Sequence, residues 1–356
     1  MNLNNIRVLL ISPLPPPVGG IASWTKQYMN WANNNGLDVK IVNISVKGKR
    51  VENINRRANI FEEIIRTISI ILKLQMNIVT FKPSVVHLNT SCARGGLFRD
   101  YLCAKIAKFH KKKLIIHYHC NIEDQINGRK LQFIILKKLA KGAADNLVLN
   151  SASSNYIEKN FGVEAQIIAN FIDESFVLSQ KKIISREINN ISFVGHVRKE
   201  KGVFEILHVA NYYPNIKFYL AGPVADEIKT MTIPKNIFLL GSISKTDIIA
   251  LLDKSDIFLF PTYSEGFSNA LLEAMARGVP IITTTVGANK DMIEEMGGIL
   301  VEKNNVSDIK KAIDELFNTN KRRIISEWDI KKVKDNYLIN KVMQDLCMIY
   351  ENYTSN

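Results

Sequence analysis

Short β-rich runs alternate with helical patterns along this chain, and the alternation stops once and then starts again. In the first half the strand-like runs include IRVLLIS from Ile6 and SVVHLNT from Ser84. In the second half they include ISFVGH from Ile191 and DIFLFP from Asp256. Strands separated by helices form parallel sheets that are covered by helices on both faces. The sequence therefore predicts an α/β protein with two tandem Rossmann-like, doubly wound domains that face a cleft.

A polar segment without either pattern separates the two halves. It contains QKKIISREINN, and we predict an interdomain linker over residues 176–190. The predicted domains are residues 1–175 and 191–330, followed by a C-terminal helical tail over residues 331–356 that the pattern assigns to neither domain. A chain of 356 residues is long enough for two domains of roughly 170 residues each.

Positive charge is concentrated in the first half. Residues 1–180 hold 24 Lys and Arg against 12 Asp and Glu, whereas residues 181–356 hold 23 against 22. A one-sided basic domain indicates an anionic partner (phosphorylated substrates, lipid headgroups or nucleic acid) or a solvated basic surface. The clusters are Lys47, Lys49, Arg50, Arg56 and Arg57, then Lys111, Lys112 and Lys113, then Arg129, Lys130, Lys137, Lys138 and Lys141.

The cysteines and the apolar runs indicate the compartment. The four cysteines show no paired spacing, which is typical of reduced thiols in a cytosolic protein rather than of disulfides or a zinc site. No run reaches the ~18 apolar residues that a membrane-spanning helix needs, and the start MNLNNIRVLL lacks the shape of a signal peptide. We therefore expect a cytoplasmic protein.

Two junctions between a strand and a helix carry residues suited to phosphate. Gly19 and Gly20 open a helix, where free N–H groups favour anions and glycine admits a ligand close to the backbone. In FVGHVRKEKGV, Arg198 and Lys201 follow a strand, as in a pyrophosphate site. An ordinary tight turn and a charged surface turn remain the alternatives. Neither G-x-G-x-x-G nor G-x-x-x-x-G-K-[ST] occurs in the chain.

The stretch SEGFSNALLEAMARGVP places two acids around the start of an apolar helix. Ser268 or Asn269 can cap this helix, so Glu265 lies in the loop and Glu273 about one turn into the helix. A carboxylate at Glu273 could accept hydrogen bonds from two vicinal hydroxyls, as on a ribose. The alternative is a pair of surface acids, which the apolar neighbours of Glu273 disfavour.

A histidine pair ends another predicted strand. His117 and His119 lie two positions apart, so alternation places both on one face of the sheet. Either could polarise a group or carry a proton, although a satisfied core histidine or a metal-binding pair would look the same. The chain has no Asp-x-Asp motif. Positive charge on a leaving diphosphate would then come from Arg, Lys and helix N-termini.

One further helical segment, IFEEIIRTISIILKL from Ile60, has an apolar face that carries Arg66 and Lys73 and follows Arg56 and Arg57. That pattern fits an interfacial helix on a membrane or a helix buried in the domain.

Taken together, these motifs resemble those of retaining glycosyltransferases of the GT-B fold, family 4. The match is most specific at the E-x7-E stretch, Glu265 to Glu273, and extends to FVGHVRKEKGV, to IIANFID and to FLLGSISKTDIIALLDKSDIFLFP. The resemblance covers almost the whole chain. It implies transfer of a hexosyl unit from an NDP-sugar to an acceptor hydroxyl with retention. The donor would bind the second domain and the acceptor the first, without a metal cofactor.

The resemblance also implies roles for single residues. Glu273 would hold the ribose, Glu265 would face the donor sugar, and Lys201 would pair with the diphosphate. The implied catalytic residues are Glu265, His119 and Lys201, and the implied donor-binding residues are Gly19, Gly20, Arg198, Lys201, Ser242, Ile243, Glu265, Gly266, Phe267, Ser268, Asn269 and Glu273. His196 stands where the family usually has Arg. The second cation is therefore Arg198, a protonated His196, or missing.

The expected partners follow from the resemblance and from the charge. They are an NDP-sugar donor, a glycan or lipid-linked acceptor in cell-envelope polysaccharide assembly, and an anionic membrane surface, with no nucleic acid. The expected location is the cytoplasm, with peripheral attachment to the inner face of the cytoplasmic membrane. Two rival functions remain: a sugar-nucleotide epimerase of the GT-B fold, and a non-catalytic anion-binding protein.

Overall fold

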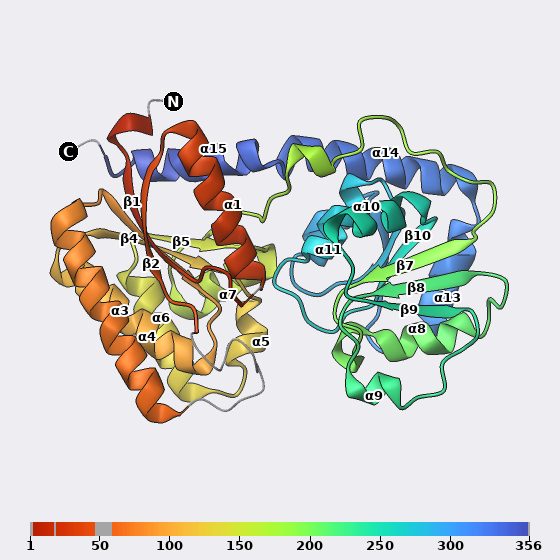
Figure 1. The fold of residues 1–356 in the computed structure, drawn as a ribbon, viewed down its shortest axis with the longest axis horizontal. Coiled ribbons are helices and arrows are strands. Elements are labelled where there is room, and N and C mark those ends of the chain that lie inside the picture. Colours follow the sequence, from red (N-terminus) through yellow and green to blue (C-terminus); the bar gives the residue numbers. More distant parts are fainter. Residues whose placement is uncertain (1–2, 18, 47–58, 355–356) are drawn as a thin grey trace. The chain divides into compact units, whose positions relative to one another are not determined.

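The computed structural model describes residues 3–17, 19–46 and 59–354, and the chain divides into two compact units (Figure 1). Unit 1 comprises Met1–Asn170 and Val342–Asn356, and unit 2 comprises Phe171–Lys341. The predicted tail is thus divided between the units, because the chain returns to unit 1 at Val342. Residues 177–189, within the predicted linker, form neither helix nor strand and belong to unit 2. The predicted basic cluster from Lys47 to Arg57 lies outside the described residues.

Unit 1 is built on a parallel sheet of six strands in the order β2-β1-β3-β4-β5-β6. The pairing register runs Val8↔Val85 and Val85↔Lys113 across its centre. The strands are β1 (Arg7–Ser12), β2 (Asp38–Asn43), β3 (Val85–Thr90), β4 (Lys113–Tyr118), β5 (Asp145–Val148) and β6 (Gln166–Ile167). Strands β1 and β3 lie in the predicted runs IRVLLIS and SVVHLNT.

Helices cover both faces of this sheet (Figure 1). Alternate strand residues such as Leu9 and Leu88 form one core with α3, α4, α6 and α7. On the opposite face Tyr28 of α1 and Tyr350 of α15 lie with their hydroxyl oxygens 3.3 Å apart. The helices are α1 (Gly20–Asn35), α3 (Ile60–Phe81), α4 (Arg94–Phe109), α5 (Ile122–Ile126), α6 (Lys130–Gly142), α7 (Ser151–Phe161) and α15 (Ile339–Glu351).

Helix α3 combines a buried face with an exposed apolar face. Ile70, Leu74 and Ile78 pack into the core of unit 1. The large apolar side chains of α3 that stay exposed are Ile60, Phe61, Ile64, Ile65, Ile68, Leu72, Met76 and Val79. By length and composition alone, α3 could cross a membrane, so the expectation that no segment of the chain meets that criterion was wrong. It is a helix of the domain that leaves these apolar side chains uncovered.

Unit 2 repeats the architecture with strand order β12-β11-β10-β7-β8-β9, all parallel. The strands are β7 (Asn190–Val194), β8 (Lys217–Ala221), β9 (Ile237–Gly241), β10 (Ile257–Phe260), β11 (Ile281–Thr284) and β12 (Gly298–Val301). The helices are α8 (Val203–Ala210), α9 (Asp226–Lys229), α10 (Lys245–Lys254), α11 (Asn269–Ala276), α12 (Asn289–Ile293), α13 (Val306–Leu316) and α14 (Thr319–Asn336). The predicted pair of doubly wound domains is therefore confirmed.

The four cysteines, Cys92, Cys103, Cys120 and Cys347, are buried and free.

Candidate functional site

The candidate site lies at the carboxyl ends of two neighbouring strands in unit 2. Strand β7 pairs with β10 on one side and β8 on the other, so the chain order reverses between β10 and β7. The register Ile257↔Ile191 brings the ends of β7 and β10 level. In doubly wound sheets, such a reversal opens the crevice in which ligands bind.

The loop after β7 is in close backbone contact with the loop after β10. Gly202 has φ +73°, and a Cβ built on it would lie 2.1 Å from the carbonyl oxygen of Pro261. The Tyr263 N–H donates to the carbonyl of Glu200 over 3.0 Å. Only glycine allows both this φ and this close approach, so Gly202 sets the position of Lys201 beside it.

Alanine at Gly202 should destabilise unit 2 by about 1–3 kcal/mol, because both the left-handed φ and the contact with Pro261 become unfavourable. Gly241→Ala is the matched control, since Gly241 has φ +64° but open space around its Cβ position. Urea unfolding measures both. Equal losses of stability in the two variants would show that the contact with Pro261 contributes nothing.

Lys201 and Glu265 form an ion pair across these two loops. The Lys201 Nζ lies 2.5 Å from the Glu265 Oε1, and each side chain is 16% exposed. The same Nζ lies 5.9 Å from the ring centroid of Phe260 at the end of β10. The structure therefore brings together the two residues that the family resemblance assigns to the donor sugar and the diphosphate.

Gly287, which was not among the predicted site residues, packs closely against the loop that carries Glu265. A Cβ on Gly287, which has φ +54°, would lie 1.9 Å from the carbonyl oxygen of Glu265. The Ala288 N–H donates to the carbonyl of Gly266 over 3.0 Å. The sequence does contain a signal for this role. Gly287 follows the strand-like run VPIITT, as Gly202 follows β7.

Glu273 lies in α11, where it is shielded from solvent. Ser268 is the N-cap, as one of the two predicted alternatives, and its hydroxyl accepts from the Leu271 N–H. Burial raises the pKa of Glu273 to about 7, and the charge of Lys245 opposes that rise. A solvated surface acid would not behave in this way. Of the two interpretations of Glu273, the structure therefore disfavours a fully exposed surface acid.

The possible second cation lies in the same turn as Lys201. Partial burial and the charges of Arg198 and Lys201 lower the pKa of His196. Arg198 is exposed, with its Nε 3.6 Å from a carboxylate oxygen of Glu200. Because a lowered pKa disfavours the protonated imidazole, Arg198 is the better of the two candidates for a cation.

The remaining donor candidates in unit 2 lie on adjacent loops. Ser242 and Ile243 follow β9 and precede α10, whose capping box joins Ser244 to Asp247. A Cβ on Gly222 would lie 1.9 Å from the carbonyl oxygen of Gly195, so the loops after β7 and β8 are in backbone contact. Phe267 and Ser268 are buried, whereas Asn269 is exposed at the start of α11.

The candidates in unit 1 fall into two groups. Gly19 is the N-cap of α1 and Gly20 its first residue, and no described heavy atom lies within 4 Å of a Cβ built on either. Neither glycine has a positive φ. Packing and backbone conformation therefore do not demand glycine here, and the space above the helix N-terminus is left for a ligand.

His119 belongs to a buried aromatic cluster. Its ring centroid lies 4.1 Å from that of His117 and 5.1 Å from that of Trp24, and His87 lies 5.6 Å from His117. The predicted shared face of His117 and His119 is therefore confirmed. Within residues 3–17, 19–46 and 59–354, no group of three or more His, Cys, Asp or Glu side chains is arranged to hold a metal ion.

Burial keeps these imidazoles neutral and makes unit 1 sensitive to acid. Burial lowers the pKa of His117 to about 3, and those of His87 and His119 also fall well below the ordinary value. Between about pH 6.5 and pH 3 the unfolded chain binds more protons than the folded one, so stability falls as pH falls. Each group contributes about 1.4 kcal/mol per pH unit within its window.

Urea unfolding from pH 7 to pH 5 should therefore show a steep loss of stability, and His117→Leu should reduce the slope below pH 6.5 by about 1.4 kcal/mol per pH unit. An unchanged slope in this variant would mean that His117 is protonated in the folded state.

Comparison with solved structures identifies the fold. Sucrose-phosphate synthase from Thermosynechococcus elongatus superposes with a TM-score of 0.77 at 13% identity, covering 98% of each chain. Anabaena HepE in complex with UDP and glucose superposes with a TM-score of 0.73 at 14% identity, covering 98% of this chain and 100% of that one. The chain has the GT-B fold of glycosyltransferases.

Sequence comparisons support the same class for this GT-B protein. Residues 177–327 match the family model for glycosyl transferases group 1. The capsular polysaccharide biosynthesis glycosyltransferase CapM of Staphylococcus aureus is 28% identical over 267 residues, which cover 71% of this chain and 65% of CapM. The chain thus spans slightly less than two thirds of that relative. These matches support a group 1 glycosyltransferase, and the matched residues include every donor candidate of unit 2.

Proposed function

We propose that this protein is a retaining family 4 glycosyltransferase that moves a hexosyl unit from an NDP-sugar to an acceptor hydroxyl. The observation that carries the proposal is the Lys201–Glu265 pair at the ends of β7 and β10, with Glu273 shielded in the helix that follows. A cation, a loop acid and a partly buried acid in the helix after β10 match the three parts of a nucleotide sugar: diphosphate, sugar and ribose.

In the proposed reaction, the acceptor oxygen forms a bond to the anomeric carbon on the face from which the diphosphate departs. The bond between that carbon and the diphosphate oxygen breaks, and the acceptor's proton passes to the leaving diphosphate. Lys201, Arg198 and the N–H groups of the Gly266–Asn269 segment stabilise the departing charge. Glu273 accepts hydrogen bonds from the ribose hydroxyls, and Ser242 and Ile243 border the base.

In unit 1, the proposal assigns Gly19 and Gly20 to contact with the diphosphate, and the open space at both glycines supports this assignment. It assigns His119 to the donor sugar, as a neutral imidazole with a lowered pKa.

We further propose that no metal is needed, because the cation and N–H groups already supply positive charge at the diphosphate. Activity should then be unaffected by EDTA, and its loss in EDTA with recovery on adding Mg²⁺ or Mn²⁺ would refute this part.

The acceptor is proposed to be a lipid-linked or growing cell-surface glycan. Among similar proteins, an Escherichia coli enzyme named UDP-Gal:alpha-D-GlcNAc-diphosphoundecaprenol alpha-1,3-galactosyltransferase is 25% identical over 187 residues, 48% of each chain. CapM has a name from capsule assembly. These names, with the UDP held by HepE, support a UDP-sugar donor and a lipid-borne acceptor as the first to test.

The proposed location is the cytoplasmic face of the membrane. Helix α3, with its exposed apolar side chains, lies in the same helical layer as α4 and α6. Helices α4 and α6 carry five lysines around a cavity of about 530 Å³. Those lysines are Lys105, Lys108, Lys137, Lys138 and Lys141. Apolar side chains together with lysines complement an anionic bilayer. The protein should sediment with anionic vesicles at low salt, and equal recovery from neutral vesicles would argue against this location.

The activity itself is tested by incubating the protein with UDP-hexoses and extracts of lipid-linked glycans, followed by NMR of the product. The proposal expects a new glycosidic bond with the anomeric configuration of the donor. An inverted product would rule out retention. Interconversion of the UDP-sugar without any acceptor would identify an epimerase instead.

A further inference from the structure

Glu205 is a buried acid beside the candidate site that the proposed reaction does not use. It lies in the first turn of α8, three residues after Gly202, and is 4% exposed. Burying a carboxyl group costs free energy, so a residue that only filled space in the core would be apolar. A buried acid at this position therefore indicates a role that needs a hydrogen-bond acceptor.

Tyr263 donates the hydrogen bond that Glu205 accepts. The Tyr263 hydroxyl lies 2.6 Å from Glu205 Oε1. Burial and this hydrogen bond raise the pKa of Tyr263, so the hydroxyl keeps its proton and remains the donor. The other carboxyl oxygen of Glu205, Oε2, is also buried and has no partner among the described residues. Within the described part of the chain, the hydrogen bonding of the Glu205 side chain thus depends on Tyr263 alone.

This hydrogen bond is a second side-chain link between the two loops that Lys201 and Glu265 join. Glu205 follows Lys201 by four residues, and Tyr263 precedes Glu265 by two. The Tyr263 N–H also donates to the carbonyl of Glu200 over 3.0 Å. Tyr263 therefore contacts residues on either side of Lys201 in the sequence, one through its backbone and one through its side chain.

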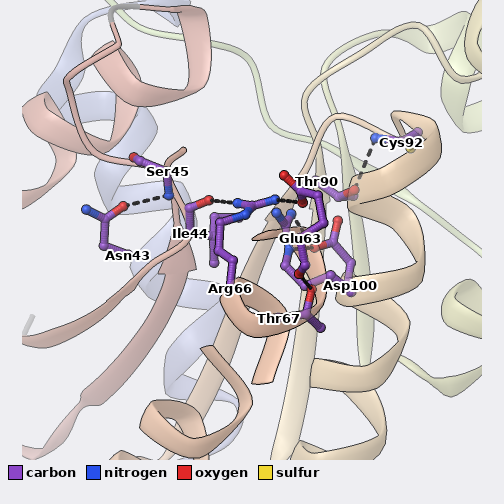
Figure 2. Close-up of polar contacts among 10 residues, drawn as sticks. Asn43, Ile44, Ser45, Glu63, Arg66, Thr67, Thr90, Cys92 and Asp100 are labelled. Atoms are coloured by element: carbon purple, nitrogen blue, oxygen red, sulfur yellow. Dashed lines mark hydrogen bonds and ion pairs between the residues drawn. The ribbon is translucent and has the colours of Figure 1, made fainter. Parts of the chain in front are cut away.

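The Lys201–Glu265 link is one that a ligand can open. The Lys201 ammonium has three donors, and among the described residues its one hydrogen-bond partner is Glu265. Figure 2 shows the opposite case in unit 1, where the Arg66 guanidinium donates both to the Glu63 carboxylate and to the Ile44 carbonyl, so that the backbone itself holds the cation. Because no backbone carbonyl of the described residues holds the Lys201 ammonium, a diphosphate can draw it away from Glu265.

A diphosphate would leave the Glu205–Tyr263 link closed. Glu205 is buried, and its carboxylate offers a phosphate oxygen no donor. The single hydroxyl proton of Tyr263 already binds Glu205. When Lys201 turns to the diphosphate, the loop that carries Glu265 loses one attachment to the Lys201 turn and keeps this one.

We propose that Tyr263 and Glu205 are positioning residues of the donor site. Their hydrogen bond keeps the loop of Glu265 in register with the turn of Lys201 while the diphosphate replaces Glu265 as the partner of the lysine. Both residues act through Lys201 and Glu265 and touch no substrate atom. The inference rests on the proposed function and deepens it, because it names the residues that maintain the reactive geometry after the donor has bound.

Tyr263→Phe removes the hydroxyl and keeps the ring. It should lower kcat by about tenfold to a hundredfold, because misplacing a reacting group by about 1 Å has effects of that size. The KM for the UDP-sugar and the affinity for UDP should stay within about threefold of wild type, since Glu273 is untouched. UDP release from UDP-glucose and UDP-galactose, with an extract of lipid-linked glycans as acceptor, gives the rates, and calorimetry gives the UDP affinity. An unchanged kcat would overturn the proposal.

Changes at Glu205 separate positioning from stability. Glu205→Gln keeps an acceptor oxygen for Tyr263 and should keep kcat within about threefold of wild type, whereas Glu205→Leu should lower it as Tyr263→Phe does. The double variant Tyr263→Phe with Glu205→Leu removes both polar groups of the link, so its melting temperature should exceed that of Tyr263→Phe. Its kcat should stay low. Recovery of kcat together with the melting temperature would show that the link contributes stability alone, and would overturn the proposal.

Tyr213→Phe is the matched control. The Tyr213 hydroxyl donates to Asp314 Oδ1 over the same distance of 2.6 Å, in the segment between α8 and β8, at the amino end of that strand. This variant should keep wild-type kcat. A loss of kcat as large as that of Tyr263→Phe would show that any lost hydrogen bond of this kind slows the enzyme, and the positioning role would fall.

The same measurements separate this inference from the proposed function. If the wild type transfers sugar and Tyr263→Phe keeps full kcat, the inference fails and the proposed function stands. If Tyr263→Phe loses UDP binding rather than kcat, Tyr263 serves binding and the positioning role is wrong. A wild type that binds no nucleotide and transfers no sugar would remove the proposed function, and this inference with it.

Discussion

Replacing Lys201 with alanine is expected to lower kcat by about 10²–10³, because removing one preorganised positive group from a site of charge development has effects of that size. Lys201 is held in place by its pair with Glu265 and by the turn that Gly202 locks against Pro261. A diphosphate arriving at the ends of β7 and β10 would meet its ammonium group. The effect should fall mainly on kcat, since the charge on the leaving group develops as the bond breaks.

The matched control is Lys199→Ala, which removes a lysine of the same turn whose side chain is exposed. It should stay close to wild-type activity, and Lys201→Arg should retain part of it because the charge is kept. Alanine at Lys201 also leaves Glu265 without its partner, so melting temperatures must accompany the kinetics. A kcat for the Lys201→Ala variant within a few-fold of wild type, in a folded protein, would remove Lys201 from the catalytic residues.

Substitution of the two glutamates should separate binding from turnover. Glu273→Gln should weaken UDP binding by about tenfold to a hundredfold. That factor corresponds to the loss of charge-assisted hydrogen bonds, which contribute about 1.5–3 kcal/mol. Glu265→Gln should leave UDP binding nearly unchanged and lower kcat by about 10². Calorimetry with UDP measures the affinity, and steady-state rates with a UDP-hexose measure kcat. If both variants changed the same parameter, the two acids would not have separate roles.

The raised pKa of Glu273 adds a pH dependence to this prediction. With a pKa of about 7 in the free protein, the carboxyl is increasingly protonated below pH 7 and then accepts hydrogen bonds less well. UDP affinity should therefore fall as pH drops from 8 to 6. Glu273→Gln should abolish that dependence, and a dependence that persists in this variant would have another source.

Local patterns in the sequence were sufficient to predict the strands and the order of the donor loops. Hydrophobic runs of four to six residues marked β7 and β10. The helix signals narrowed the N-cap of α11 to Ser268 or Asn269, and Ser268 is the N-cap. The alternation rule placed His117 and His119 on one face. Each of these depends on residues within a few positions of one another, which is what periodicity and capping preferences report.

What the sequence did not reveal depends on contacts between distant residues. Gly287 lies close against the backbone carbonyl of Glu265, and the Tyr263 N–H donates to the carbonyl of Glu200. Neither contact has a signature in local composition. The return of the chain to unit 1 at Val342, where Tyr350 meets His87 at 2.5 Å, is likewise a tertiary event.

The apolar pattern of α3 left two interpretations open. The structure shows why: one side of the helix is buried on the sheet while Ile60, Ile64 and Ile68 remain exposed. A hydrophobic pattern reports how apolar a helix is, and only the fold determines which side is covered.

The most direct measurement is the melting temperature of the wild-type protein with UDP, GDP and their sugars at concentrations up to several millimolar. A ligand at 100 times its Kd stabilises the folded state by about 2.7 kcal/mol. At roughly 2–4 °C per kcal/mol, one nucleotide should raise the transition of the donor-binding unit by about 5–10 °C. The account predicts such a shift with a nucleoside diphosphate and its absence with Glu273→Ala at the same concentration. Melting that no nucleotide changes, or a shift that Glu273→Ala retains in full, would contradict it.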